Sequence, residues 1–261
     1  MKNLSEILRR ASEVWREEGI KSLWFKILGE TIYRRMVVME HLLDEPIPEV
    51  IPRLPITIGL LQEKDIAEYV RFRPETNPIQ VRERLAAGQI CFVAWHEGQI
   101  IHATWVAFGH AWIAYLNREI TLAPNEVYSY ESFTVPAFRG QNVYGACLSY
   151  EQQVLKRAGY RRIVLAIMPE NKAAFRPVEK AGFRPIGVIG YLRLGPWRCN
   201  FTHLWPGVRP LGQLSDPSGA DYWDNVAQRM PTKAHYLDPF LCEMKKRAHL
   251  ALIARWDAMP S

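Results

Sequence analysis

The sequence contains few cysteines and no CxxC pair. The four are Cys91, Cys147, Cys199 and Cys242, and they lie far apart in the chain. This spacing argues against both a zinc site and a disulfide framework, and it favours a reducing compartment. We therefore expect a cytoplasmic protein that holds no metal.

Long apolar segments that would target or cross a membrane are also scarce. The N-terminus is charged from Lys2 onward, so it lacks the apolar region of a signal peptide. One uncharged run, residues 98–117, contains polar side chains such as His102 and His110, and its β-branched start indicates a buried strand. With 261 residues, 48% of them hydrophobic, the chain can bury the core of a soluble globular protein.

Net charge is confined to one part of the chain. Residues 136–184 contain nine Lys and Arg residues and three Glu residues, which accounts for the whole formal net charge of +6. A local basic excess favours a polyanionic ligand at one site over a chain that binds nucleic acid. The alternative is that several of these cations belong to ordinary solvated helix faces.

The N-terminal residues have a helical pattern. Residues 1–45 are expected to form helices, and apolar residues from Trp24 to Leu43 recur on one face of the second. Flanking basic residues make this face a candidate for membrane association, although packing on the main domain or on a second copy in a homodimer is the alternative. Four prolines between Pro46 and Pro55 then predict an extended linker.

The following residues have the periodicity of an α/β (α+β) domain. Expected strands are 56–61, 90–95, 99–108, 127–135, 162–168 and 185–194, and expected helices are 62–72, 79–87, 143–158 and 172–181, with an apolar insert at 111–122. This order predicts a mixed, mostly antiparallel central sheet with helices on both faces. We divide the chain into an N-terminal helical extension with linker, 1–50, a main domain, 51–195, and an aromatic-rich C-terminal extension ending in a helix, 196–261.

The turn after the strand at 127–135 is the clearest candidate for ligand binding. It runs through Arg139, Gly140, Gln141, Asn142, Val143 and Tyr144 into the helix. A strand that feeds a helix through a tight turn directs free backbone amides at whatever lies above the turn. The turn therefore suits a phosphate group.

The turn and a later segment resemble the GNAT acyltransferase superfamily. The similarity rests on Pro136 to Gly140 before one helix and on Asn171 to Phe183 around the next, and it covers about residues 56–194. It implies an acyl-CoA-dependent N-acyltransferase, with acetyl-CoA or coenzyme A as co-substrate. The pyrophosphate would lie on the turn, the pantetheine beside Asn171 and the thioester at the end of the preceding strand. The coenzyme A-binding residues so implied are Phe133, Thr134, Val135, Arg139, Gly140, Gln141, Asn142, Val143, Tyr144 and Asn171.

Three residues depart from the family pattern. Asn142 and Tyr144 replace the usual glycines of the turn, and Val178 replaces a tyrosine that protonates the leaving thiolate in many members. Asn142 tolerates the left-handed conformation that the turn requires. The ring of Tyr144 must swing aside, and it would then either narrow the pyrophosphate site or stack on a neighbour. Because valine cannot donate a proton, Tyr144 and Tyr191 become the candidate acids.

Glu131 is the first candidate for the catalytic base. It is the only carboxylate in residues 128–133, and a charge in so apolar a strand is expected to face a cavity or a partner. A salt bridge to a helix arginine, or exposure at an edge, is the alternative. Tyr130 is the reserve candidate, because a β-bulge would change which side chains of the strand line the site. His102 and His110 follow.

The predicted function is transfer of an acetyl or longer acyl group from acyl-CoA to a primary amine of a small molecule. One alternative is an N-acyl amino acid synthase that takes a long acyl chain from acyl carrier protein, which would dock on the basic face. Another is a non-catalytic scaffold that binds acyl-CoA, which Tyr144 and Val178 favour. The aromatic residues after Leu194 would either cover the acceptor pocket or pack against the N-terminal helices.

Overall fold

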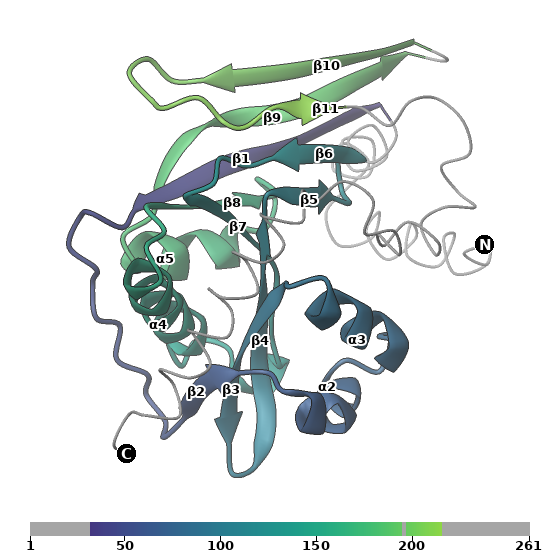
Figure 1. Cartoon of the computed structure of the whole chain (residues 1–261). Helices are drawn as coiled ribbons and strands as arrows, with labels where there is room; N and C mark the ends of the chain where they lie inside the picture. Colours follow the sequence, from purple (N-terminus) through teal and green to yellow (C-terminus); the bar gives the residue numbers. More distant parts are fainter. Residues whose placement is uncertain (1–31, 195–196, 216–261) are drawn as a thin grey trace, which may run out of the picture.

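The computed structural model describes residues 32–194 and 197–215, and the fold of these residues is centred on one large sheet. The strand order is β10-β9-β1-β8-β7-β4-β3-β2 (Figure 1). The strands are β1 (Tyr33–Leu42), β2 (Thr57–Leu60), β3 (Ile90–His96), β4 (Gln99–Phe108), β7 (Glu126–Thr134), β8 (Arg162–Ile167), β9 (Arg184–Leu194) and β10 (Trp197–Leu204). A smaller sheet joins β11 (Leu214–Ser215), β6 (Arg118–Thr121) and β5 (His110–Ile113).

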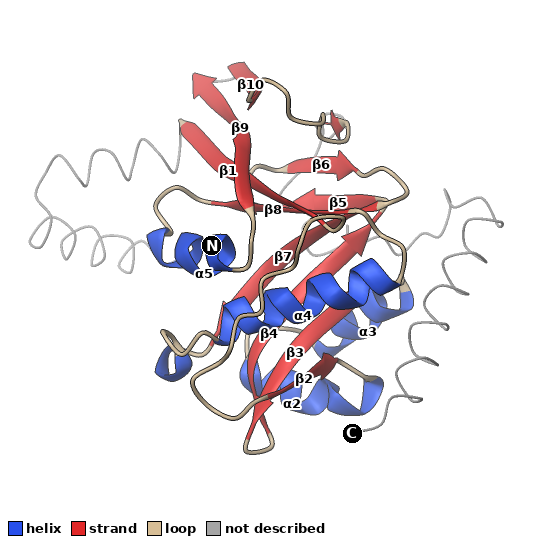
Figure 2. Cartoon of the chain, turned by 90° about the vertical axis from the view of Figure 1, so that its left-hand side faces the viewer, coloured by secondary structure: helices blue, strands red, loops and turns tan. Residues whose placement is uncertain are grey.

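Helices cover both faces of the large sheet, as predicted. They are α2 (Ile66–Phe72), α3 (Pro78–Ala86), α4 (Val143–Arg157) and α5 (Lys172–Lys180), with short 3-10 helices η1 (Glu63–Asp65) and η2 (Pro136–Phe138). Leu148 of α4 and Val178 of α5 pack in one core cluster with β3, β7 and β8. On the other face, Tyr69 of α2 and Val81 of α3 pack against Trp105 of β4. The two helix pairs therefore lie on opposite sides of the sheet (Figures 1 and 2).

The pairing of β7 with its neighbouring strands determines where the candidate site lies. β7 pairs in parallel with β8 from Glu126 to Ser129, and it pairs antiparallel with β4 as far as Thr134. Its register with β4 shifts by one residue, so that Glu131 and Ser132 both lie opposite a single residue of β4. Glu131 has a φ of 52°, the left-handed conformation of a β-bulge. The β7–β8 ladder therefore ends just before a bulge in β7.

The helix expected up to Leu43 is wrong for Tyr33–Leu42, which form β1 in the interior of the sheet. β1 pairs antiparallel with both β8 and β9. A strand buried on both faces gives a nearly continuous apolar run, and such a run also satisfies helical spacing. These ten residues therefore belong to the sheet rather than to a helical extension. The expected helices before residue 32 lie outside the described residues.

The segment between β1 and β2 is extended, as the prolines predicted, and it runs across α4 (Figure 2). The Ser149 hydroxyl donates to the carbonyl of Pro48 at 2.7 Å. Val50 packs so closely on Gly145 that a Cβ there would lie 2.9 Å from the Val50 Cγ1. This close approach explains a glycine within the helix.

The remaining strands were not predicted. The apolar insert forms the β5–β6 hairpin of the second sheet, and β10 extends the large sheet beyond β9. After β10 the chain returns to pair β11 with β6. The predicted final helix, after residue 215, lies outside the described residues.

Candidate active site

The turn between β7 and α4 has the predicted conformation. Gly140 has a φ of 76° and Asn142 a φ of 61°, so both adopt the left-handed region. The Asn142 side chain does not cap α4 but donates to the carbonyl of Ile51 at 3.1 Å. Asn142 thus preserves the turn in place of glycine and leaves the first backbone amides of the helix without a side-chain cap.

The Tyr144 side chain points away from the turn and packs between α4 and the sheet. Its ring lies 5.2 Å from the imidazole of His102, with an interplanar angle of 31°. Its hydroxyl is hydrogen-bonded to the side chain of Ser132, while burial raises the pKa of the Tyr144 phenol well above its ordinary value. Of the two expected outcomes for this ring, contact with a neighbour is the one observed, with the ring tilted against His102, and the phenol stays protonated.

A line of polar side chains lies between α4 and the sheet. The Nδ1 of His102 is 2.7 Å from the Thr134 hydroxyl, and the Thr104 and Ser132 hydroxyls are hydrogen-bonded to each other. Burial lowers the pKa of His102 to about 3, so this imidazole is neutral at physiological pH. A neutral, buried His102 can orient Thr134, but it cannot act as a cation.

The line continues to Glu151, which sequence reasoning missed. The Ser129 hydroxyl donates to the Glu151 Oε2 at 3.3 Å. Burial raises the pKa of Glu151 to about 8, with Ser129 partly offsetting the rise. Glu151 lies on the buried stripe of α4, with Cys147 and Leu155 one turn to either side. A carboxylate at a core position of a helical repeat was the signal available in the sequence.

Glu131 is held by an arginine of α3, which was the alternative considered for it. Arg84 donates to both carboxylate oxygens, at 2.6 and 3.1 Å. The Arg84 side chain is 13% exposed and that of Glu131 43%, and the guanidinium also lies 5.1 Å from the Trp105 ring. A two-point ion pair of this kind holds the carboxylate in one position and occupies both of its oxygens.

Tyr130 lies on the same face of the sheet as Trp105. Its hydroxyl donates to the Gln89 Oε1, and its ring stacks on Tyr128 at 6.0 Å. Burial raises the pKa of Tyr130 well above its ordinary value. Tyr130 is therefore a protonated, hydrogen-bonded phenol and not a ready proton acceptor.

The residues expected beside a thioester meet at the end of β7. The Arg73 guanidinium lies 4.6 Å from the Phe133 ring centroid, and that of Arg139 lies 5.8 Å from it. Arg139 also donates to the Thr134 carbonyl at 3.2 Å. The amide of Val135 is already used, because it donates to the Ile101 carbonyl at 2.9 Å. These contacts place two cations at the strand end from which the turn begins.

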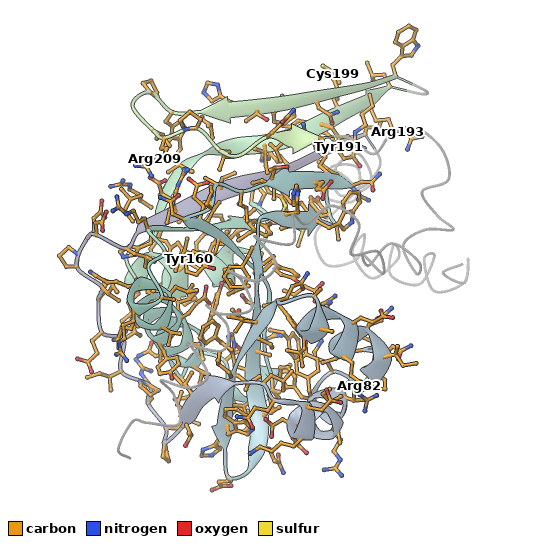
Figure 3. All side chains as sticks on the ribbon, in the orientation of Figure 1. Arg82, Tyr160, Tyr191, Arg193, Cys199 and Arg209 are labelled. Atoms are coloured by element: carbon orange, nitrogen blue, oxygen red, sulfur yellow. The ribbon has the colours of Figure 1, made fainter. Side chains whose placement is uncertain are left out.

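The other expected site residues are dispersed. Asn171 precedes α5 without a side-chain cap bond, and Val178 is fully buried in the core. Tyr191, a candidate acid, lies on β9 well away from α4 and α5 (Figure 3), with the Arg198 guanidinium 4.1 Å from its ring. His110 is exposed in β5. The structure thus brings neither Tyr191 nor His110 to the end of β7.

The described part of the chain has neither a candidate metal cluster nor a membrane-spanning helix. Residues 32–194 and 197–215 contain no group of three His, Cys, Asp or Glu side chains arranged to hold a metal. Within the same ranges, every helix is too short or too polar to span a membrane.

Comparison with known proteins gives similarity only at the level of solved structures. No family model and no curated protein matches the sequence. A GCN5-related N-acetyltransferase from Sphaerobacter thermophilus is 17% identical with a TM-score of 0.44, over 64% of this chain and 54% of that one. A GNAT-family acetyltransferase from Colwellia psychrerythraea is 12% identical with a TM-score of 0.42, over 65% and 59%. This chain thus spans less than two thirds of either protein.

A third similar structure is that of the aminoglycoside N-acetyltransferase AAC(6')-Iy in complex with CoA. It is 19% identical with a TM-score of 0.40, over 49% of this chain and 91% of that one. At such identities and TM-scores the similarity carries no argument about activity, which must come from the geometry of this chain.

Proposed function

We propose that this protein is a GNAT-like acyltransferase that moves an acetyl or longer acyl group from acyl-CoA to a primary amine of a small molecule. One observation carries the proposal. The β7–β8 ladder ends at Ser129, while β7 continues through a bulge and turns through Gly140 and Asn142 into α4. A strand end beside a helix N-terminus offers a place for a thioester next to a place for phosphate.

The residues of the turn fit a pyrophosphate. A Cβ on Gly140 would meet nothing within 4 Å, so the space beside this residue is open. The Tyr144 ring does not fill that space, because it packs against His102 between α4 and the sheet. Arg139 and Arg73 add positive charge at the strand end. The turn with the first amides of α4 would hold the phosphates, and Thr134 with Asn171 would lie along the pantetheine. When bound, the coenzyme supplies the activated acyl group.

The chemistry requires two proton movements. An amine is largely protonated at neutral pH, with a pKa near ~10.4, so it must lose a proton before it attacks the thioester carbonyl. The departing thiolate, whose thiol has a pKa near ~8.5, is a better leaving group when it takes a proton as the C–S bond breaks. Glu131 stays a proposed contact for the ammonium group, because its paired carboxylate suits binding a cation better than removing a proton.

The non-catalytic acyl-CoA scaffold is the second candidate. Val178 is buried in the core and Glu131 is paired with Arg84, so neither supplies an obvious proton donor or acceptor. The acyl carrier protein alternative depends on the surface charge of residues 136–184. A cytoplasmic location and association with a second copy stay expectations.

A thiol-release assay distinguishes the three. Wild-type protein is incubated with acetyl-CoA, a long-chain acyl-CoA or a long-chain acyl carrier protein and a panel of primary amines, and free thiol and acylated amine are measured. Acyl-amine formation from acyl-CoA supports the proposal. Transfer from acyl carrier protein alone supports the synthase, and binding of acyl-CoA without thiol release supports the scaffold.

A further inference from the structure

Large apolar side chains are exposed where β9 and β10 meet at the edge of the large sheet (Figure 1). Trp197 is 79% exposed, Leu194 61% and Leu192 38%. The register of the two strands pairs Trp197 directly with Leu194, so both side chains lie on the same face of the hairpin. Neighbouring exposed side chains of this size are uncommon on soluble monomers and indicate an interaction surface.

β1 extends this apolar face. Tyr33, which is also exposed, pairs with Leu192 and therefore lies on the same side of the sheet. Its ring stacks on that of Phe201 of β10, with 5.8 Å between the ring centroids. A Cβ on the intervening Gly190 would lie 2.6 Å from the Phe201 Cζ, so the glycine allows the two rings to meet.

These side chains form one surface across three adjacent strands. We call it the hairpin patch, and it consists of Tyr33, Leu192, Leu194, Trp197 and Phe201.

The charges of the strand segments that carry the hairpin patch are positive. Residues 185–194 and 197–204 contain two arginines and no acidic residue, and residues 33–36 of β1 add two more arginines. Arg35 and Arg193 are exposed. The Arg35 guanidinium lies 5.6 Å from the Tyr33 ring, and Figure 3 shows Arg193 at the same end of the sheet as Cys199 of β10. The apolar patch is therefore bordered by cations.

A membrane surface with anionic headgroups matches both properties. A tryptophan ring favours the boundary between headgroups and acyl chains, where its apolar body and its N–H group both find suitable surroundings. Arginines at the same depth contact lipid phosphates while their aliphatic stems stay in the apolar layer. A second copy of this chain would instead bring the same arginines against their own counterparts, so that like charges meet.

We propose that the hairpin patch binds the surface of membranes that contain anionic lipids. Trp197 and Leu194 enter the headgroup layer, and Arg35 and Arg193 lie against the phosphates. The contact is peripheral, because only side chains enter the bilayer. It does not depend on the proposed acyl transfer, since no residue of the turn between β7 and α4 takes part.

Cosedimentation of the full-length chain with sucrose-loaded vesicles tests the proposal. The wild type should bind vesicles of equal parts phosphatidylcholine and phosphatidylglycerol, and it should bind pure phosphatidylcholine roughly tenfold more weakly. The double variant Leu194→Ser and Trp197→Ser should bind the mixed vesicles roughly tenfold or more weakly, because it has less apolar surface to bury. Its melting temperature should match that of the wild type, since both side chains are exposed.

Trp205→Ser is the matched control for the apolar side chains. Trp205 is 41% exposed and directly follows β10, at the opposite end of the strand from Trp197. The control should bind the mixed vesicles as the wild type does.

A second pair of variants tests the charge. Arg35→Gln combined with Arg193→Gln should weaken binding to the mixed vesicles roughly tenfold. Arg71→Gln combined with Arg82→Gln removes the same charge from exposed positions on α2 and α3 and should leave binding unchanged. Figure 3 shows Arg82 far from the hairpin.

Three results would overturn the proposal. The first is absence of wild-type binding to the mixed vesicles, and the second is unchanged binding by the Leu194→Ser and Trp197→Ser variant. The third is loss of binding in Trp24→Ser alone, which would assign the membrane contact to the N-terminal apolar face. Sedimentation velocity without lipid completes the test, because a wild-type dimer that the patch variant dissociates, without vesicle binding, would make the patch an interface between copies.

Discussion

The ion pair with Arg84 changes the role expected of Glu131. Glu131 lies in a left-handed bulge, and its two oxygens are both bonded to a guanidinium that is itself largely buried. Losing this carboxylate would remove two hydrogen bonds from the Arg84 guanidinium. Removing Glu131 should therefore destabilise the fold, and a test of catalysis must separate this loss of stability from a loss of turnover.

We expect Glu131→Gln to lower the melting temperature and to change kcat less than tenfold, because both oxygens of the carboxylate are already bonded to Arg84. Thermal unfolding and the thiol-release rate, measured on the same preparation, check this. Glu75→Gln is the control, since Glu75 is an exposed partner of Arg73. A 10²-fold loss of turnover with unchanged stability would instead make Glu131 the base.

Two buried titratable groups, Glu151 of α4 and His102 of β4, predict opposite effects of pH on stability. The pKa of Glu151 is about 8 in the fold and 4.5 ordinarily, so the folded state keeps a proton that the unfolded state loses, and stability falls as pH rises through that interval. The pKa of His102 falls from 6.5 to about 3, so stability falls as pH drops below 6.5. Of these two groups, Glu151 is the one that acts between pH 6.5 and 8.

As pH rises from 6.5 to 8, the melting temperature of the wild type should decline, whereas that of Glu151→Gln should stay level. Melting curves at half-unit steps of pH measure the difference. Parallel curves for the two proteins would show that Glu151 is already ionised in the folded state.

β1 is held in the sheet by a buried ion cluster. Arg162 of β8, 0% exposed, donates to Glu40 of β1 at 2.7 Å and to Glu126 of β7 at 3.0 Å. It also donates to the carbonyls of Pro210 and Arg209 at 2.9 and 3.0 Å. One guanidinium therefore joins three adjacent strands to the segment that follows β10.

Arg162→Met should lower the free energy of unfolding by about 3–5 kcal/mol, since it leaves the buried Glu126 carboxylate without its guanidinium and takes from Glu40 one of its two arginine partners. Urea denaturation measures the change. The neighbouring Arg161→Met removes an exposed arginine from the same turn and should have an effect within about 0.5 kcal/mol. Equal effects of the two substitutions would contradict the buried cluster.

Sequence periodicity predicted the elements whose patterns are unambiguous. The hairpin of β3 and β4, the strand β7 and the helices α2 to α5 were all placed within a few residues, because alternation and capping signals agreed. β1 was mistaken for a helix because its apolar run fits both periods, and Glu40 could not be recognised as the partner of an arginine 122 positions away. β10 was missed because it is an edge strand in which no side chain is buried, so no apolar run marks it.

The candidate site was predictable only where it depends on local backbone. Asn142 took the expected left-handed conformation because that preference is intrinsic to the residue. The partners of Glu131 and Tyr130 depend on α3 and on the loop before β3, so no local pattern could reveal them. The sequence shows Glu151 as a carboxylate at a core position of α4. Its hydrogen bond with Ser129 of β7 could be known only from the fold.

Over most of the chain the positive and negative charges balance, and one segment is basic. That segment, residues 136–184, carries the whole net charge of +6 and contains the turn, α4, β8 and α5. The end of β7, the turn and the start of α4 thus combine left-handed backbone at Gly140 and Asn142 with positive charge from Arg73 and Arg139. The proposed polyanionic acyl donor at the turn accounts for both features.

Calorimetric titration with coenzyme A tests this account most directly. Wild-type protein should bind one equivalent, Arg139→Gln should bind about tenfold more weakly, and Arg157→Gln, which removes an equal charge at the far end of α4, should bind as the wild type does. Absence of binding by the wild type, or equal weakening in both variants, would contradict a specific coenzyme site at the turn.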